Sequence, residues 1–460
     1  MTRTLLVGAA IAVLAIFLIS GIVSSPMIAS AVSFPTIVNI SGSSEGSTTY
    51  PFVANVGDQF YVAWSAKSGI FFRSYNATTN TWTPALVSSP MELSVKPSIG
   101  PVGYPVIAAN ASNVYVEFVQ NNKSNSGLQQ VFVAVSNNSG ATFVTDRIGA
   151  PFKNINAERG EPSAAAWGSD VYLTWANYGV ATYVVASQDN GSTWGSVIQM
   201  QGPREQQIAA YGHDAYFVSD RSNGQFLVNV TQNDGLSWTA HTINQPNINE
   251  QGVSEPWVVA TGSSAYLVWH TKNPLPSTIF GAYTLDDGNT WTTYCPNTSC
   301  ELNTTDGNYY NPQIALTGNG NVAMTYFMFA GSHGEIFERV LDTGTQTWGP
   351  ATLLTGPSKT NWAYNVATAG SYVFTTYGIQ SGSTTSYAYV SYSSDNGATW
   401  LTSPGLKASQ NPSGTLAAPI DNNEGSVSVG ISTSHALVAW EQNAGGTTSY
   451  QIYASISSLP

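Results

Sequence analysis

Three glutamates hold equivalent positions in successive repeats of this sequence. Glu161, Glu205 and Glu255 each stand eleven residues before the tyrosine that opens an apolar segment. Neighbouring carboxylates can bind a cation, accept hydrogen bonds from sugar hydroxyl groups, or act together as general acid and base. Polar residues take the same place in four other repeats, one of them a residue further away: Tyr50, Tyr104, Asn311 and Asn361. These seven residues form a candidate binding ring.

The ring also has a purely structural interpretation, because a strand that starts beside a water-filled channel favours polar residues anyway. Proline follows at 51, 105, 162, 256 and 312 and is expected to keep the preceding ring residue extended. Arg159, Arg204 and Arg221 fall in loops expected on the same face, where their guanidinium groups could bind an anion. Pairing with neighbouring glutamates is the alternative that we favour for them.

The two cysteines of the chain, Cys295 and Cys300, lie close together in sequence, and the five histidines show no metal-ligand spacing. A structural zinc site needs more ligands than this pair supplies. We therefore predict a disulfide that closes a short loop in an oxidising compartment. No metal site is predicted with certainty, and calcium at the glutamate ring is the one cofactor left open.

Short strands joined by a recurring turn must position these residues. Residues 187–194 (SQDNGSTW) return as 393–400 (SSDNGATW), with looser copies at 136–143, 231–238 and 284–291. The third residue, Asp or Asn, can accept hydrogen bonds from its own turn, and the glycine two residues later tolerates positive φ. We expect structural roles for Asp189, Gly191, Trp194, Asn233, Gly235, Trp238, Asp286, Gly288, Trp291, Asp395, Gly397 and Trp400.

This turn resembles the Asp-box, or bacterial neuraminidase repeat, of sialidase-like β-propellers. The resemblance implies blades of four antiparallel strands, with the boxes on one face and any chemistry on the opposite face. Many unrelated activities and many binding proteins share this repeat, and an exo-sialidase would also carry an Arg-Ile-Pro motif and further arginines that bind the substrate carboxylate. The sequence departs from that pattern, since no Arg-Ile-Pro occurs and Arg73 stands inside an expected strand. The residues of the family's active site therefore do not map onto this chain.

Eight second strands can be recognised from their apolar and aromatic pattern, from residues 61–64 to residues 437–440. The last repeat ends after its third strand, whereas an additional strand at residues 34–40 precedes the first repeat. We predict an all-β protein with a single propeller of eight four-stranded blades, closed by the N-terminal strand, which leaves no unpaired end. Seven blades are the alternative.

Residues 1–31 have the features of a signal peptide: Arg3, an apolar run, and Ala29-Ser30-Ala31 as a cleavage site. An uncleaved signal anchor is the alternative, and it would be the only contact with a membrane. The propeller is assigned to residues 32–460, outside the cytoplasm, either secreted or attached to the cell surface. Sequons such as those at Asn39, Asn76 and Asn229 are compatible with glycosylation.

Only 9% of the residues are charged, the net charge is −12, and no basic stripe occurs, which argues against a nucleic-acid partner. We expect an extracellular recognition or scaffold module that binds a glycan or a protein, without catalysis. A glycoside hydrolase of the exo-sialidase type, acting through the face without boxes, is the alternative.

Overall fold

The computed structural model describes residues 32–460 outside a set of short gaps. The ranges left out are 1–31, 43–47, 96–100, 122–127, 153–161, 178, 203–205, 221–225, 244–252, 272–276, 295–301, 303–307, 331–332, 356–359, 382–384, 409–426 and 444–449. The predicted signal segment, both cysteines, Glu161, Glu205 and the three loop arginines lie outside the described residues.

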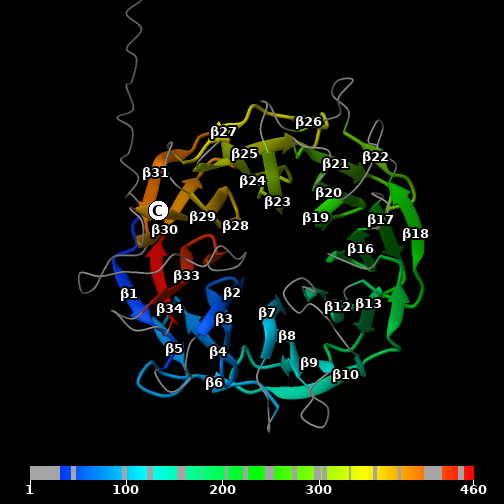
Figure 1. Ribbon diagram of the computed structural model, residues 1–460, viewed down its shortest axis with the longest axis horizontal. Helices are drawn as coiled ribbons and strands as arrows, with labels where there is room; N and C mark the ends of the chain where they lie inside the picture. Colours follow the sequence, from blue (N-terminus) through cyan, green and yellow to red (C-terminus); the bar gives the residue numbers. More distant parts are fainter. Residues whose placement is uncertain are drawn as a thin grey trace, which may run out of the picture.

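Eight antiparallel sheets are arranged around one axis, as the repeats predict (Figure 1). Blade 1 contains β2 (Thr48–Val56), β3 (Gln59–Ala66), β4 (Gly69–Asn76), β5 (Thr81–Thr83) and the short β6 (Met91–Glu92). Blade 2 contains β7 (Pro101–Asn110), β8 (Asn113–Asn121), β9 (Gln129–Ser136) and β10 (Val144–Phe152). Blade 3 contains β11 (Ser163–Trp167), β12 (Asp170–Asn177), β13 (Ala181–Ser187) and β14 (Ile198–Met200). Blade 4 contains β15 (Gln206–Tyr211), β16 (Asp214–Asp220), β17 (Phe226–Thr231) and β18 (Thr239–Ile243).

The second half of the ring repeats this plan. Blade 5 contains β19 (Val253–Thr261), β20 (Ser264–Thr271), β21 (Ile279–Thr284) and β22 (Thr292–Thr293). Blade 6 contains β23 (Asn308–Leu316), β24 (Val322–Ala330), β25 (His333–Asp342), β26 (Thr347–Trp348) and β27 (Thr352–Leu353). Blade 7 contains β28 (Thr360–Ala369), β29 (Tyr372–Ser381), β30 (Thr385–Ser393) and β31 (Leu401–Lys407). Blade 8 contains β32 (Val427–Ile431), β33 (His435–Asn443), β34 (Tyr450–Ser458) and β1 (Thr36–Asn39).

Closure by the N-terminal strand is confirmed, and with it the count of eight blades. β1 pairs antiparallel with β34, and Thr36 lies opposite Ile456. Just before β1, the side chains of Val32 and Phe34 are buried against blades 7 and 8. The fourth strand of the last blade therefore comes from the start of the propeller, so blade 8 has no unpaired outer edge at β34.

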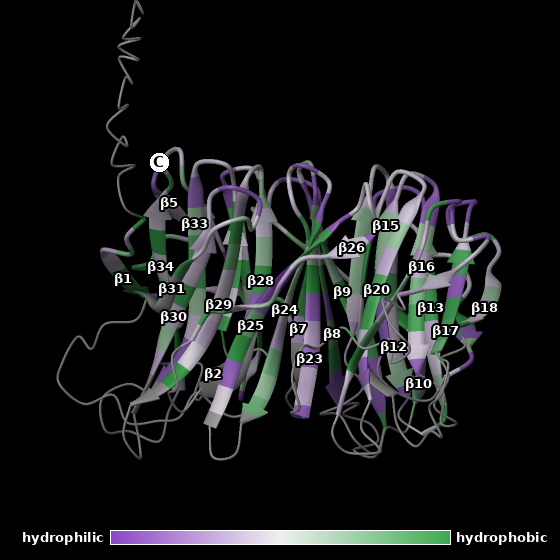
Figure 2. Cartoon of the chain, turned by 90° about the horizontal axis from the view of Figure 1, so that it is seen from above, coloured by the Kyte–Doolittle hydropathy of each residue, from purple (hydrophilic) through white to green (hydrophobic). Residues whose placement is uncertain are grey.

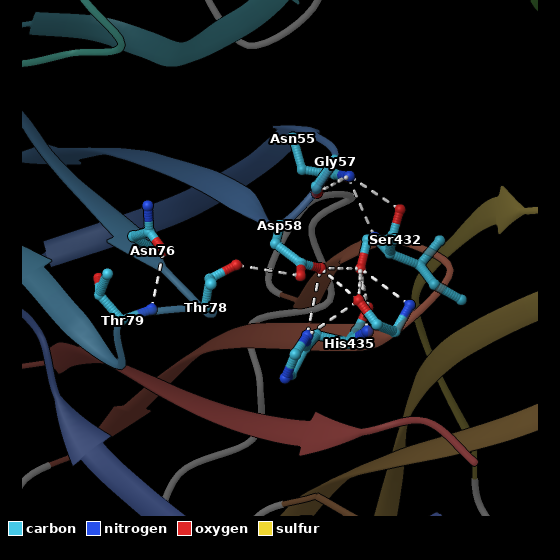
Figure 3. A network of polar contacts seen from close by, with 10 residues as sticks. Asn55, Gly57, Asp58, Asn76, Thr78, Thr79, Ser432 and His435 are labelled. Atoms are coloured by element: carbon cyan, nitrogen blue, oxygen red, sulfur yellow. Dashed lines mark hydrogen bonds and ion pairs between the residues drawn. The ribbon is translucent and has the colours of Figure 1, made fainter.

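A polar network joins the first blade to the last (Figure 3). The carboxylate of Asp58, in the turn between β2 and β3, accepts hydrogen bonds from the hydroxyl groups of Ser432 (2.5 Å) and Ser434 (2.6 Å) and lies 3.1 Å from Nδ1 of His435. The side chain of Asn55 adds two hydrogen bonds with the backbone of Ile431: its Nδ2 donates to the carbonyl group, and its Oδ1 accepts from the N–H. These side chains thus join the turn after β2 to the turn before β33, two segments that lie more than 370 residues apart in the sequence.

The recurring turns between third and fourth strands, here called box turns, fold as their sequence predicts. The Oδ1 atom of Asp189 accepts a hydrogen bond from the N–H of Thr193 (2.8 Å), and its Oδ2 accepts from the Thr193 hydroxyl (2.7 Å). These bonds lower the pKa of Asp189. Gly191 has φ +78°, a conformation that favours glycine.

Each box turn also contacts the preceding blade. Tyr172 of β12 packs edge-on against Trp238, with ring centroids 6.2 Å apart, and Tyr216 meets Trp291 in the same way at 6.2 Å. The box turns lie on the same face as the turns between first and second strands, because the N–H of Asn190 bonds the carbonyl of Ser169. We call this the box face and the opposite one the box-free face; Figure 2 shows the strands running between them.

No helix occurs among the described residues, so none of them forms a helix able to cross a membrane. Among the predicted sequons, Asn229 is only 5% exposed within β17, which excludes it as a surface site of the folded protein.

Candidate functional site

The ring positions that the structure describes coincide with bulges in the inner strands. Tyr50, Glu255 and Asn311 have φ of +54°, +52° and +49°, and the pairing with the second strand shifts at each of them. The prediction that the following proline keeps these residues extended is therefore wrong. The reason is the bulge, in which one extra residue turns into the left-handed region and leaves the ladder. The proline that follows has no N–H to donate to the neighbouring strand, and a bulge is a place in a sheet where such a residue is tolerated.

The same irregularity occurs in two more inner strands. The register shifts between Val102 and Val106 in β7 and between Thr360 and Tyr364 in β28, and these intervals contain Tyr104 and Asn361. Left-handed backbone at non-glycine residues costs free energy and tends to occur at functional sites. Five of the seven ring positions thus fall at comparable distortions at the start of an inner strand.

Two ring residues from neighbouring blades are in direct contact. The N–H of Asn311, in blade 6, donates a hydrogen bond of 3.1 Å to Oε2 of Glu255, in blade 5. The same carboxylate oxygen lies 3.1 Å from Nδ1 of His270, near the end of β20. The ring of Tyr310 packs edge-on against His270, with centroids 5.4 Å apart. We call these four residues the Glu255 cluster.

In the Glu255 cluster, two buried residues support one carboxylate that is partly accessible to solvent. His270 is fully buried and Asn311 is 7% exposed, whereas 23% of the Glu255 side chain is accessible. The contacts of Oε2 with Asn311 and His270 hold the Glu255 carboxylate in one orientation, and the accessible part of the carboxylate can contact a ligand. A carboxylate so placed accepts hydrogen bonds from hydroxyl groups, and the partly buried Tyr310 adds an aromatic surface beside it.

Of the predicted ring, the structure therefore brings Glu255 and Asn311 together. Tyr50 is half-buried at the equivalent place in blade 1, and the side chains of Tyr104 and Asn361 lie outside the described part. Glu161, Glu205, Arg159, Arg204 and Arg221 are not described, so their roles stay predictions. The same holds for the disulfide between Cys295 and Cys300.

Sequence reasoning missed His270 and Tyr310. His270 lies in blade 5 and Tyr310 in blade 6, and no sequence motif connects the two residues. The signal that could have found them is positional: Tyr310 directly precedes the ring residue Asn311, and His270 is the second-last residue of β20, which pairs with the strand that contains Glu255.

Arg73 has a structural role, in line with its predicted strand position. It is 2% exposed, and its guanidinium donates to the carbonyl groups of Ile40 (2.7 Å), Pro84 (2.6 Å), Ala85 (2.8 Å) and Ser88 (2.6 Å). It is therefore not placed to bind a substrate carboxylate.

Comparison with known proteins supports the fold. No family model and no curated protein sequence matches the chain. Among solved structures, the chain is similar to the polysaccharide lyase Uly1, with a TM-score of 0.51 and 10% identity over 93% of this chain and 100% of that one. It is similar to a PL25 ulvan lyase with bound saccharide, with a TM-score of 0.50 and 11% identity over 91% of this chain and 95% of that one. The sialidase of Trypanosoma rangeli matches with a TM-score of 0.37 and 14% identity over 68% of this chain and 58% of that one. At these identities the first two similarities establish a shared propeller architecture, and the third adds no argument.

Proposed function

We propose that this protein is an extracellular, glycan-binding propeller that holds a saccharide at the Glu255 cluster on its box-free face. The observation that carries the proposal is the partly exposed Glu255 carboxylate, held in one orientation by His270 and by the N–H of Asn311. Oriented carboxylates and aromatic rings supply the contacts that sugar hydroxyl groups and sugar faces need. The propeller architecture shared with two polysaccharide lyases supports the same ligand class.

The test is a binding screen with neutral, uronate-containing and sialylated glycans, followed by titration of any glycan that binds. Glu255→Gln keeps the shape of the side chain but removes its charge. Loss of a charge-assisted hydrogen bond should weaken binding by about 10- to 100-fold. Glu92→Gln, an exposed glutamate on the outer β6 strand of blade 1, is the matched control and should bind normally. Equal affinity in both variants would contradict the proposed site.

A polysaccharide-cleaving enzyme is the second candidate function. It is favoured by the accessible part of the Glu255 carboxylate, which could act as a general acid or base toward a bound saccharide. A lyase acting on uronate-containing chains would create an unsaturated product that absorbs ultraviolet light, whereas a hydrolase would release only reducing ends. We expect no release of sialic acid from sialosides, because the arginine pattern of exo-sialidases is missing from the sequence.

Export remains part of the proposal. It rests on the apolar segment within residues 1–31 and on the small residues that end it. N-terminal sequencing of protein collected from the culture medium should show a mature chain that starts after Ala31. A full-length chain retained in the membrane fraction would instead favour the signal anchor.

A further inference from the structure

One side-chain position recurs at successive contacts between blades on the box face. It pairs the residue two places before the tyrosine of a second strand with the fourth residue of the next blade's box turn. Between blades 2 and 3 the pair is neutral: Nδ2 of Asn113 donates to Oδ1 of Asn190 at 2.9 Å. We call such a pair a seam pair. The amide pair shows that this position can be filled without charge.

Between blades 3 and 4 the seam pair consists of two carboxyl groups. Asp170, at the start of β12, is 8% exposed and hydrogen-bonds with Asp234 of the next box turn. Burial, followed by the charge of Asp234, raises the pKa of Asp170 to about 6. Two ionised carboxylates this close to each other, within hydrogen-bonding reach, repel each other unless a proton or a cation lies between them.

An imidazole completes this group. His213 lies in the turn between β15 and β16, and its Nδ1 is 2.7 Å from Oδ1 of Asp234. Its side chain is 79% exposed and is therefore free to adjust, whereas Asp234 is 27% exposed. One ligand atom from each of Asp170, His213 and Asp234 lies within 4.8 Å of the others. No other such group of three occurs among the described residues.

We propose that Asp170, His213 and Asp234 bind a divalent transition-metal ion of the Zn²⁺ type, which links blades 3 and 4 on the box face. Two carboxylates and one imidazole nitrogen are three ligands of the kind that Zn²⁺ takes in proteins, with a further position for water. The imidazole favours Zn²⁺ over Ca²⁺ and Mg²⁺, which prefer oxygen ligands.

The next seam pair supplies a matched control. Asp214 and Asp287 occupy the same positions between blades 4 and 5, and they too are hydrogen-bonded to each other. In the described part of the chain, no histidine completes a metal-binding group of three with them. If the imidazole decides binding, the first pair should bind Zn²⁺ and the second should not.

The experiment uses the mature chain after removal of metals by a chelator. Calorimetric titration with ZnCl₂ should show one Zn²⁺ bound, and the melting temperature should rise with Zn²⁺ concentration because the ion binds the folded state. CaCl₂ and MgCl₂ should have little effect. Asp170→Asn and His213→Gln should lose both the heat of binding and the Zn²⁺-dependent rise, whereas Asp214→Asn should retain them.

Asp170→Asn is expected to fold, because an asparagine amide at this position can donate to Oδ1 of Asp234 as Asn113 donates to Oδ1 of Asn190. Two results would overturn the proposal. One is wild-type protein whose melting temperature does not respond to Zn²⁺. The other is Zn²⁺ binding that persists unchanged in both Asp170→Asn and His213→Gln, which would place the ion elsewhere on the chain.

Discussion

Glu338 shows what one buried ionisable residue does in the core of this propeller. It lies on β25 in blade 6, is 1% exposed, and accepts hydrogen bonds from the hydroxyl groups of Thr325 and, at 3.4 Å, of Thr375 in blade 7. Burial raises its pKa to about 8, and the two hydroxyl groups only partly oppose this shift. Glu338 is therefore mostly protonated at neutral pH.

The raised pKa predicts that Glu338 lowers the stability of the folded protein as pH rises, and that Glu338→Gln removes this loss. The unfolded chain loses this proton near pH 4.5 and the folded chain near pH 8, so wild-type stability falls as pH rises between these values. Glutamine keeps the size of the neutral acid and cannot ionise. Thermal unfolding should show similar wild-type and variant proteins at pH 4 and a variant more stable by about 2–4 kcal/mol at pH 8. A difference that does not change with pH would contradict the assignment.

At the scale of residues, the sequence predicted part of the candidate site. Equivalent places in the repeats correctly indicated that Glu255 and Asn311 are neighbours, because the fold places repeats side by side. His270 and the proposed metal-binding group of Asp170, His213 and Asp234 were missed. Asp170 lies in blade 3 whereas His213 and Asp234 lie in blade 4, and no recognisable motif connects them along the chain. In a propeller, position within the repeat therefore carries more information than spacing in sequence.

At the scale of elements, the box turn serves as a contact between blades as well as a hairpin. Gly235 has φ +83°, and a Cβ atom built on it would lie 2.6 Å from Cβ of Ala186 and 3.2 Å from Cε1 of Tyr172, both in blade 3. The sequence predicted the positive φ at this position. It could not show the contact with the preceding blade, which depends on how blades pack.

Gly235→Ala tests this second role of the turn. The substitution should combine backbone strain with a clash between blades 3 and 4, at a cost of about 2–4 kcal/mol in the free energy of unfolding. Gly212→Ala is the control, since Gly212 has φ +63° but nothing within 4 Å of its Cβ position. Strain alone should cost that variant about 1–2 kcal/mol. Equal losses in denaturant unfolding would mean that the contact with blade 3 contributes nothing.

At the scale of the whole molecule, the ring closes at blade 8, which combines the first strand of the propeller with its last three. β1 pairs with β34 there, Ile40 is fully buried between blades 8 and 1, and Asp58 bonds the turn of blade 8. The missing last strand and the additional first strand predicted the pairing. The Asp58 network was not predictable, because its partners are more than 370 residues away and carry no motif.

Asp58 should therefore make ring closure sensitive to acid. Burial opposes ionisation of its carboxyl group, but the hydrogen bonds from Ser432, Ser434 and His435 prevail and lower its pKa to about 2. Because its pKa in the folded protein lies below the unfolded value of 3.8, the contribution of Asp58 to the free energy of unfolding is complete above about pH 4 and is lost as pH falls through 2.

Asp58→Ala should destabilise the protein at pH 6 by about 1 kcal/mol, since the network is partly exposed. Asp342→Ala is the control, because Asp342 accepts a hydrogen bond from Gly344 within its own turn rather than across blades. Thermal unfolding from pH 6 to pH 2 should bring Asp58→Ala and the wild type together as the pH falls. A gap of constant size would show that the Asp58 charge does not hold the ring closed.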